Sequence, residues 1–106
     1  MAFAGPEAPS TPPAASAHVS QRGRRFDPGR VAIEAGTLLE ITNDETATVH
    51  NVRIDDARLR IDTGVQDPGE TVAIAFPEPG TYRAFCAIHT RMRLEVEVRP
   101  RTASVR

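Results

Sequence analysis

The sequence predicts an all-β fold, a Greek-key β-sandwich or barrel of about seven or eight strands. Apolar residues alternate with polar or small residues in several short segments, most regularly in Leu-Glu-Val-Glu-Val at residues 94–98. Strict alternation places one set of side chains in a core and the other in water, as in a half-buried strand. Turn sequences separate these segments at intervals of roughly ten residues, and no long stretch repeats with the helical period.

The predicted domain covers residues 18–100 and has a recognisable order of strands and turns. Alternating apolar residues place strands around residues 31–33, 39–41, 52–54, 72–76, 81–85 and 94–98, and turn signals fall at residues 27–29, 35–36, 43–44, 67–69 and 77–80. Residues 1–17 contain four prolines and a single charge, so we expect a disordered Pro/Ala-rich lead or linker there. Residues 101–106 are expected to form a flexible tail.

Composition excludes several classes of function. The chain has 106 residues, 40% of them hydrophobic, with 13 basic and 14 acidic side chains, which is typical of one small monomeric domain. No apolar run approaches the length of a membrane span, and no basic patch or aromatic-studded strand indicates a nucleic-acid surface. The lead lacks the basic and apolar regions of a signal peptide, although Ala-Phe-Ala-Gly at residues 2–5 is similar to the end of a cleavage site.

The single cysteine, Cys86, has three possible roles: a buried apolar residue, a reactive thiol or a metal ligand. His89 and Met92 follow at three-residue intervals, in a tight turn before the last predicted strand. His50 begins an earlier strand, which a sandwich can bring beside this turn. Two imidazoles, one thiolate and one thioether suit copper that cycles between Cu(I) and Cu(II), whereas methionine is a poor zinc ligand.

Cysteine catalysis is the alternative for Cys86 and His89. A cysteine hydrolase needs the imidazole within hydrogen-bond reach of the thiol, together with an orienting group and an oxyanion hole. Two side chains three residues apart in a tight turn converge on a common metal more readily than on each other, and no glycine-rich anion pocket is evident. We therefore expect a protein that is not an enzyme.

A longer pattern around these residues resembles the cupredoxins, the small type 1 blue copper proteins of the plastocyanin, amicyanin and azurin type. PEPGTYRAFCAIHTRM resembles their copper-binding loop, and its spacing Cys-x-x-His-x-x-Met is similar to that of amicyanin-like members. RRFDPGRVAIEAGTLLEITNDE resembles the opening strands, VHNV the segment of the first copper histidine, and IDTGVQDPGETVAIAF the approach to the loop strand. The likeness extends over residues 19–98.

The resemblance implies a cupredoxin-like sandwich that binds one copper ion and transfers one electron. It implies that His50, Cys86 and His89 are the strong ligands and that Met92 is the axial ligand. Asn51 would then hydrogen-bond across to the ligand loop and hold the site in shape. A copper carrier or storage protein that uses the same ligands without electron transfer is the alternative function.

The turn before His50 departs from the family pattern. The segment Asn43 to His50 is a residue longer than the usual turn, and Val49 stands where proline is common. The position of His50 therefore depends on the path of this turn. Thr90 and Leu94 also stand where proline and glycine are frequent in the family.

The resemblance also implies a protein redox partner and a periplasmic or extracellular location. Arg91 and Arg93 flank Met92, which favours a positive docking end and an acidic partner surface. The alternative is that these arginines simply solvate an exposed turn. We expect His18 to be exposed at the edge of the lead, with no ligand role.

Overall fold

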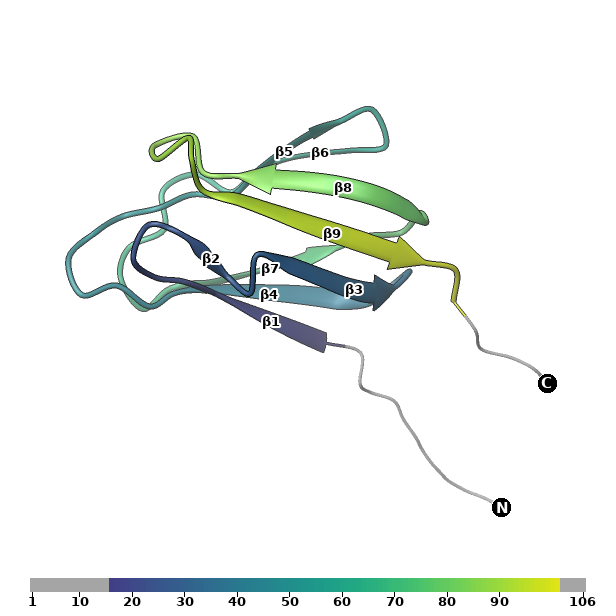
Figure 1. The fold of residues 1–106 in the computed structure, drawn as a ribbon, viewed down its shortest axis with the longest axis horizontal. Coiled ribbons are helices and arrows are strands. Elements are labelled where there is room, and N and C mark those ends of the chain that lie inside the picture. The colour runs from purple at the N-terminus through teal and green to yellow at the C-terminus, as the bar shows by residue number, and fades with distance from the viewer. Residues whose placement is uncertain (1–15, 102–106) are drawn as a thin grey trace, which may run out of the picture.

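The computed structural model describes residues 16–101, and within them all regular structure is β-strand (Figure 1). Two sheets pack face to face, with strand orders β2-β1-β4-β7 and β3-β9-β8-β5-β6. The strands are β1 (Ser16–Gln21), β2 (Phe26–Asp27), β3 (Arg30–Glu34), β4 (Leu38–Asn43), β5 (Arg53–Asp56), β6 (Leu59–Asp62), β7 (Thr71–Ala75), β8 (Gly80–Phe85) and β9 (Arg93–Arg99). The all-β prediction is confirmed.

The number and direction of the strands differ from the expectation in detail. Nine strands lie within the described residues, because Phe26–Asp27 pairs briefly with β1 before the chain crosses to the other sheet as β3. That crossing makes β1 run parallel to β4, and β3 runs parallel to β9, so the sheets are mixed rather than purely antiparallel. As a result β1 and β4 end side by side, with Gln21 in register with Asn43.

The first strand begins at Ser16, two residues before the predicted start of the domain. His18 lies on this strand and is exposed, as expected, with its Nε2 atom 2.9 Å from Thr42 Oγ1. The predicted lead up to residue 15 and the predicted tail from residue 102 lie outside the described residues. No helix that could cross a membrane is found in residues 16–101.

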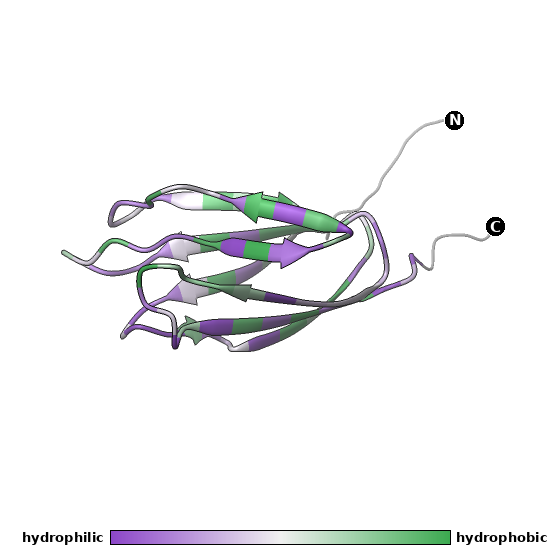
Figure 2. Ribbon diagram, turned by 90° about the horizontal axis from the view of Figure 1, so that it is seen from above, coloured by the Kyte–Doolittle hydropathy of each residue, from purple (hydrophilic) through white to green (hydrophobic). Residues whose placement is uncertain are grey.

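The core lies between the sheets and follows the alternation in the sequence. Leu94, Val96 and Val98 on β9 are buried, whereas the glutamates between them are partly exposed. Figure 2 shows this alternation as bands of opposite hydropathy along the strands. The strands therefore form a rigid support for the loops at their ends.

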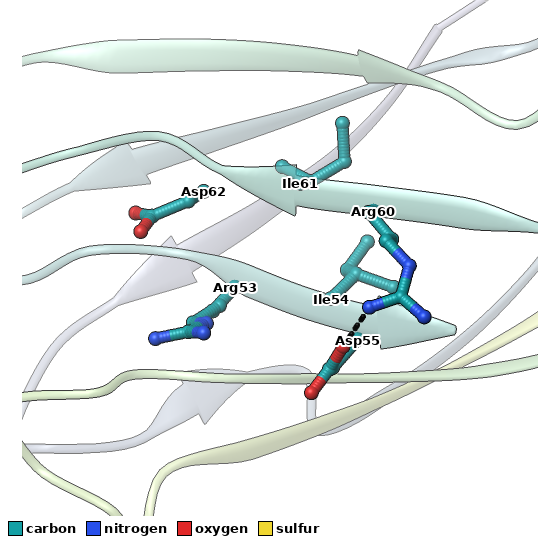
Figure 3. Close-up of a pocket in the computed structure, with 6 residues that line it drawn as sticks. All are labelled: Arg53, Ile54, Asp55, Arg60, Ile61 and Asp62. Carbon is teal, nitrogen blue, oxygen red and sulfur yellow. Dashed lines mark hydrogen bonds and ion pairs between the residues drawn. The ribbon is translucent and has the colours of Figure 1, made fainter. Parts of the chain in front are cut away.

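The β5–β6 hairpin carries charges on its exposed side (Figure 3). Arg53 is in register with Asp62 and Asp55 with Arg60, and Arg60 Nη1 lies 3.0 Å from Asp55 Oδ1. Exposed ion pairs of this kind contribute little to stability. The pocket of about 190 Å³ on this hairpin is lined by none of the residues that form the metal-ligand cluster of residues 16–101.

Candidate metal centre

The predicted ligand loop connects β8 to β9 at one end of the sandwich (Figure 1). Beyond the last strand pair, the Cys86 amide donates to the Met92 carbonyl at 3.3 Å, and the Met92 amide donates to the His89 carbonyl at 2.9 Å. The side chains of Cys86 and Met92 are buried, with 0% and 1% of their surface exposed, whereas His89 is partly exposed. The loop thus holds two sulfur atoms inside the protein and one imidazole at its surface.

His50 reaches the same end of the sandwich from a distant part of the sequence. Its amide donates to the Gln66 carbonyl at 3.1 Å, and its carbonyl accepts from the Gln66 amide at 2.6 Å. The strand that follows, β5, pairs with β8 at Arg53 and Phe85, immediately before Cys86. His50 is fully buried in this position.

Three predicted ligands form a compact cluster. The Nδ1 atoms of His50 and His89 each lie 3.9 Å from Cys86 Sγ, and all three ligand atoms lie within 4.8 Å of one another. The two imidazole rings meet at 65°, with their centroids 5.0 Å apart. Metal–nitrogen bonds of about 2.0 Å and metal–sulfur bonds of about 2.3 Å, set at 120°, would separate nitrogen from sulfur by about 3.7 Å. The cluster therefore fits one ion in a trigonal arrangement.

The same geometry argues against cysteine catalysis. The separation of 3.9 Å between the sulfur and either imidazole nitrogen lies at the long end of hydrogen-bond distances to sulfur. Both imidazoles face one sulfur atom, which is the arrangement that a metal needs and a hydrolase does not. Met92 adds a thioether that lies in the interior of the same loop. The donor set, two nitrogens and two sulfurs, is the one that suits copper.

Asn51 ties the strand after His50 to the ligand loop. Its backbone amide donates to Cys86 Sγ at 3.4 Å, and its side-chain oxygen accepts from the Ala87 amide at 2.7 Å. A hydrogen bond from an amide to the sulfur fixes the position of this proposed ligand atom. This is the hydrogen bond across to the ligand loop that the family resemblance implies.

The longer turn before His50 folds around the buried side chain of Asn43. The Asn43 amide group donates to the carbonyls of Thr48 and Gln66, both at 3.0 Å, and its oxygen accepts from the Glu45 amide at 3.0 Å. His50 consequently remains within the ligand cluster.

Glu45 is a functional residue that the sequence did not indicate. Its Oε2 atom lies 3.0 Å from His50 Nε2, on the side of the ring opposite to Cys86. Such a carboxylate fixes the orientation of the ring and the nitrogen that carries the proton, and leaves Nδ1 free to bind metal. The hydrogen bond from His50 lowers the pKa of Glu45, so the carboxylate stays ionised. A glutamate five residues before a histidine has no sequence signature that would have identified it.

The surroundings of His89 favour its neutral form. Burial of the ring lowers its pKa most, and the nearby charges of His50 and Arg24 lower it further, against the opposing effect of Glu45. A lowered pKa means that the imidazole loses its proton at lower pH than a free histidine does. The neutral imidazole is the form that binds metal ions.

Comparisons with known proteins agree with this site. The model of the plastocyanin/azurin family of copper binding proteins matches residues 14–99. Similar solved structures include the Cu(I) form of a methionine-to-alanine variant of amicyanin, with a TM-score of 0.73 and 22% identity over 78% of this chain and 81% of that chain. A reduced tryptophan-to-tyrosine variant of amicyanin matches with a TM-score of 0.74 and 23% identity over 79% and 82% of the two chains.

At these identities the structural matches show the shared fold, and the family match adds the copper chemistry. The family model spans nearly all of the described residues and includes the four predicted ligands. The donor set in the structure is consistent with that chemistry. The chain therefore belongs to the plastocyanin/azurin family of copper-binding proteins, the cupredoxins, and its cofactor is copper.

Proposed function

We propose that this protein is a mononuclear type 1 copper protein that carries single electrons between redox partners. His50, Cys86 and His89 would be the strong ligands of the copper ion, and Met92 would supply a weaker fourth ligand. The observation that carries the proposal is the convergence of two imidazole nitrogens on one buried sulfur, each at 3.9 Å. A site of two histidines and one cysteine with a weak axial methionine is typical of copper proteins that transfer electrons.

The protein would serve this function by holding the ligands in fixed positions. Copper, when bound, supplies the one-electron chemistry by alternating between Cu(I) and Cu(II). Cys86 is held by Asn51 and by its backbone hydrogen bond to Met92, and His50 is held by Glu45. Ligands that cannot rearrange keep the structural change between the two oxidation states small.

His89 is the proposed point at which electrons enter and leave. It is partly exposed, whereas His50, Cys86 and Met92 are buried and exclude water from the site. A partner that docks over the loop would contact the edge of the His89 ring. The partner is proposed to be a redox protein with an acidic surface, and the protein is proposed to act as a monomer in the periplasm or outside the cell.

A copper carrier or storage protein would use the same ligands but must also release the ion. Hydrogen bonds from Asn51 and to Glu45 hold Cys86 and His50 in place. Ligands held in this way favour a permanently bound ion. A carrier or storage protein would hold Cu(I) without the visible thiolate band, and the proposed electron carrier is not an enzyme.

Absorption and electron paramagnetic resonance spectra of the copper-loaded protein test the proposal. We expect an intense visible band from charge transfer between the thiolate and Cu(II), which disappears on reduction and returns on oxidation. A colourless protein that holds only Cu(I), or a Cu(II) spectrum without the thiolate band, would reject the electron-transfer function.

Met92→Leu is expected to retain copper and to raise the reduction potential. Leucine fills the same volume, so the free energy of unfolding should fall by less than about 1.5 kcal/mol. Loss of the thioether removes electron density from the axial position, which destabilises Cu(II) relative to Cu(I). Protein-film voltammetry measures the potential, and the reverse exchange Leu94→Met, at a buried core position two residues away, is the matched control. An equal shift in both variants would argue against an axial role for Met92.

A further inference from the structure

The turn between β1 and β2 holds an arginine in an unusual backbone conformation. Arg22 and Arg25 exchange two backbone hydrogen bonds, of 3.0 and 3.2 Å, around Gly23 and Arg24. Both central residues have positive φ angles, 62° for Gly23 and 57° for Arg24, as expected in the tight turn of a hairpin. Glycine adopts this conformation freely, but arginine rarely does. Local strain of this kind is found preferentially at functional sites.

This turn places Arg24 beside the ligand loop. Arg24, His89, Thr90 and Arg91 together line a pocket of about 410 Å³. The Arg24 amide also donates to Glu45 Oε2 at 3.4 Å, so the turn is connected to the residue that orients His50. Figure 1 shows the β1–β2 turn and the loop between β8 and β9 at the same end of the sandwich.

The pocket is lined by two cationic side chains and no carboxylate. Neither the Arg24 nor the Arg91 guanidinium forms an ion pair or side-chain hydrogen bond with any residue in the range 16–101. Glu45 lies near the turn, but its Oε2 atom is engaged by His50 and the Arg24 amide. The two guanidinium groups therefore remain available to a group from outside the described chain.

We infer that this pocket binds a carboxylate side chain of the redox partner and aligns the partner with His89. Guanidinium groups match the planar carboxylate and bind it through paired hydrogen bonds. Thr90 also lines the pocket, and its side chain carries a hydroxyl donor. The inference rests on the proposed electron-transfer function, because it assigns a docking role to the surface around the proposed electron entry point.

Occupation of the pocket has a consequence for the direction of electron flow. A carboxylate bound next to His89 places a negative charge near the metal, which stabilises Cu(II) relative to Cu(I). The reduction potential should fall when the partner binds. A docked acidic partner is then a better electron acceptor for this protein than the same partner in solution.

The test is a titration of the reduced, copper-loaded protein with a peptide of four glutamates, followed by ¹H–¹⁵N NMR at low ionic strength. We expect shifts of the backbone amides of Arg24, Thr90 and Arg91. A peptide of four glutamines should have no effect. Arg24→Gln and Arg91→Gln should each weaken binding about three- to fivefold and reduce its dependence on salt. Arg83→Gln, at an exposed arginine on β8 that lines a different pocket, is the matched control.

Several results would overturn the inference. These are equal binding of both peptides, unchanged affinity in Arg24→Gln and Arg91→Gln, and binding of inorganic phosphate at these residues without binding of the glutamate peptide. The visible spectrum of the oxidised, copper-loaded protein separates the two proposals. Peptide binding by a protein whose oxidised, copper-loaded form lacks the visible band would reject electron transfer and retain the anion pocket. A normal copper band without peptide binding would reject the pocket alone.

Discussion

Cys86→Ser is expected to abolish the intense visible absorption of the copper-loaded protein. The band requires charge transfer from a thiolate to Cu(II), and Cys86 is the only cysteine in the chain. A serine hydroxyl remains protonated at neutral pH and is a poor ligand for either oxidation state. Removal of a residue that only hydrogen-bonds to a metal ligand costs about 10- to 100-fold in metal affinity. Removal of the ligand Cys86 itself should therefore cost more than about 100-fold.

The experiment needs evidence that the variant remains folded. Serine is close to cysteine in size, and its oxygen can still accept the hydrogen bond from the Asn51 amide. The amide NMR spectrum of the metal-free variant should therefore match that of the metal-free wild type away from the loop. Competition with a Cu(I) chelator measures the affinity. Retention of the visible band in Cys86→Ser would show that the band does not arise from a thiolate, and an unchanged copper affinity would show that copper binds elsewhere.

His50→Ala is expected to change the copper spectrum and to weaken copper binding by about 100-fold or more, for the same reason. The imidazole supplies one of three strong donors and is fully buried, so its removal leaves a space that opens a coordination position. Imidazole added to the solution should enter this space and restore part of the original spectrum. Absorption and paramagnetic resonance spectra, recorded with and without imidazole, measure both effects.

His18→Ala is the matched control for this variant. His18 is exposed on β1, where its ring contacts Thr42, and it is not a member of the metal-ligand cluster. Its replacement should leave the copper spectrum and affinity unchanged. If His50→Ala behaved like His18→Ala, the assignment of the first histidine ligand would be wrong.

The ligand loop is the part of the site that the sequence predicts best. Cys86, His89 and Met92 lie in one short turn between two alternating strands, and the three-residue spacing brings Cys86 Sγ within 3.9 Å of His89 Nδ1. The strands with regular alternation, such as β4 and β9, were predicted for a similar reason, since their buried residues recur at every second position. Local patterns of this kind are visible in a single sequence.

Features that depend on distant contacts could not be predicted. The path of the turn before His50 is determined by Asn43, whose side chain bonds to carbonyls five and twenty-three residues away. Strand β1 was missed because its buried positions include the polar Gln21 as well as Val19, and β6 was missed because it offers only two apolar residues, Leu59 and Ile61. The approach of Arg24 to His89 depends on a turn conformation that arginine seldom adopts. The bond from Asn43 to the Gln66 carbonyl and the approach of Arg24 to His89 both join segments that are far apart in the sequence.

The ends of the described chain lie away from the metal. The loops that hold the ligands are at one end of the sandwich, whereas β1 begins and β9 ends at the other (Figure 1). An affinity tag or surface linker attached near either terminus would therefore orient the metal loops towards solution. An electrode coated in this way would present His89 to soluble partners, and a linker at an engineered cysteine near the loop would present the opposite face.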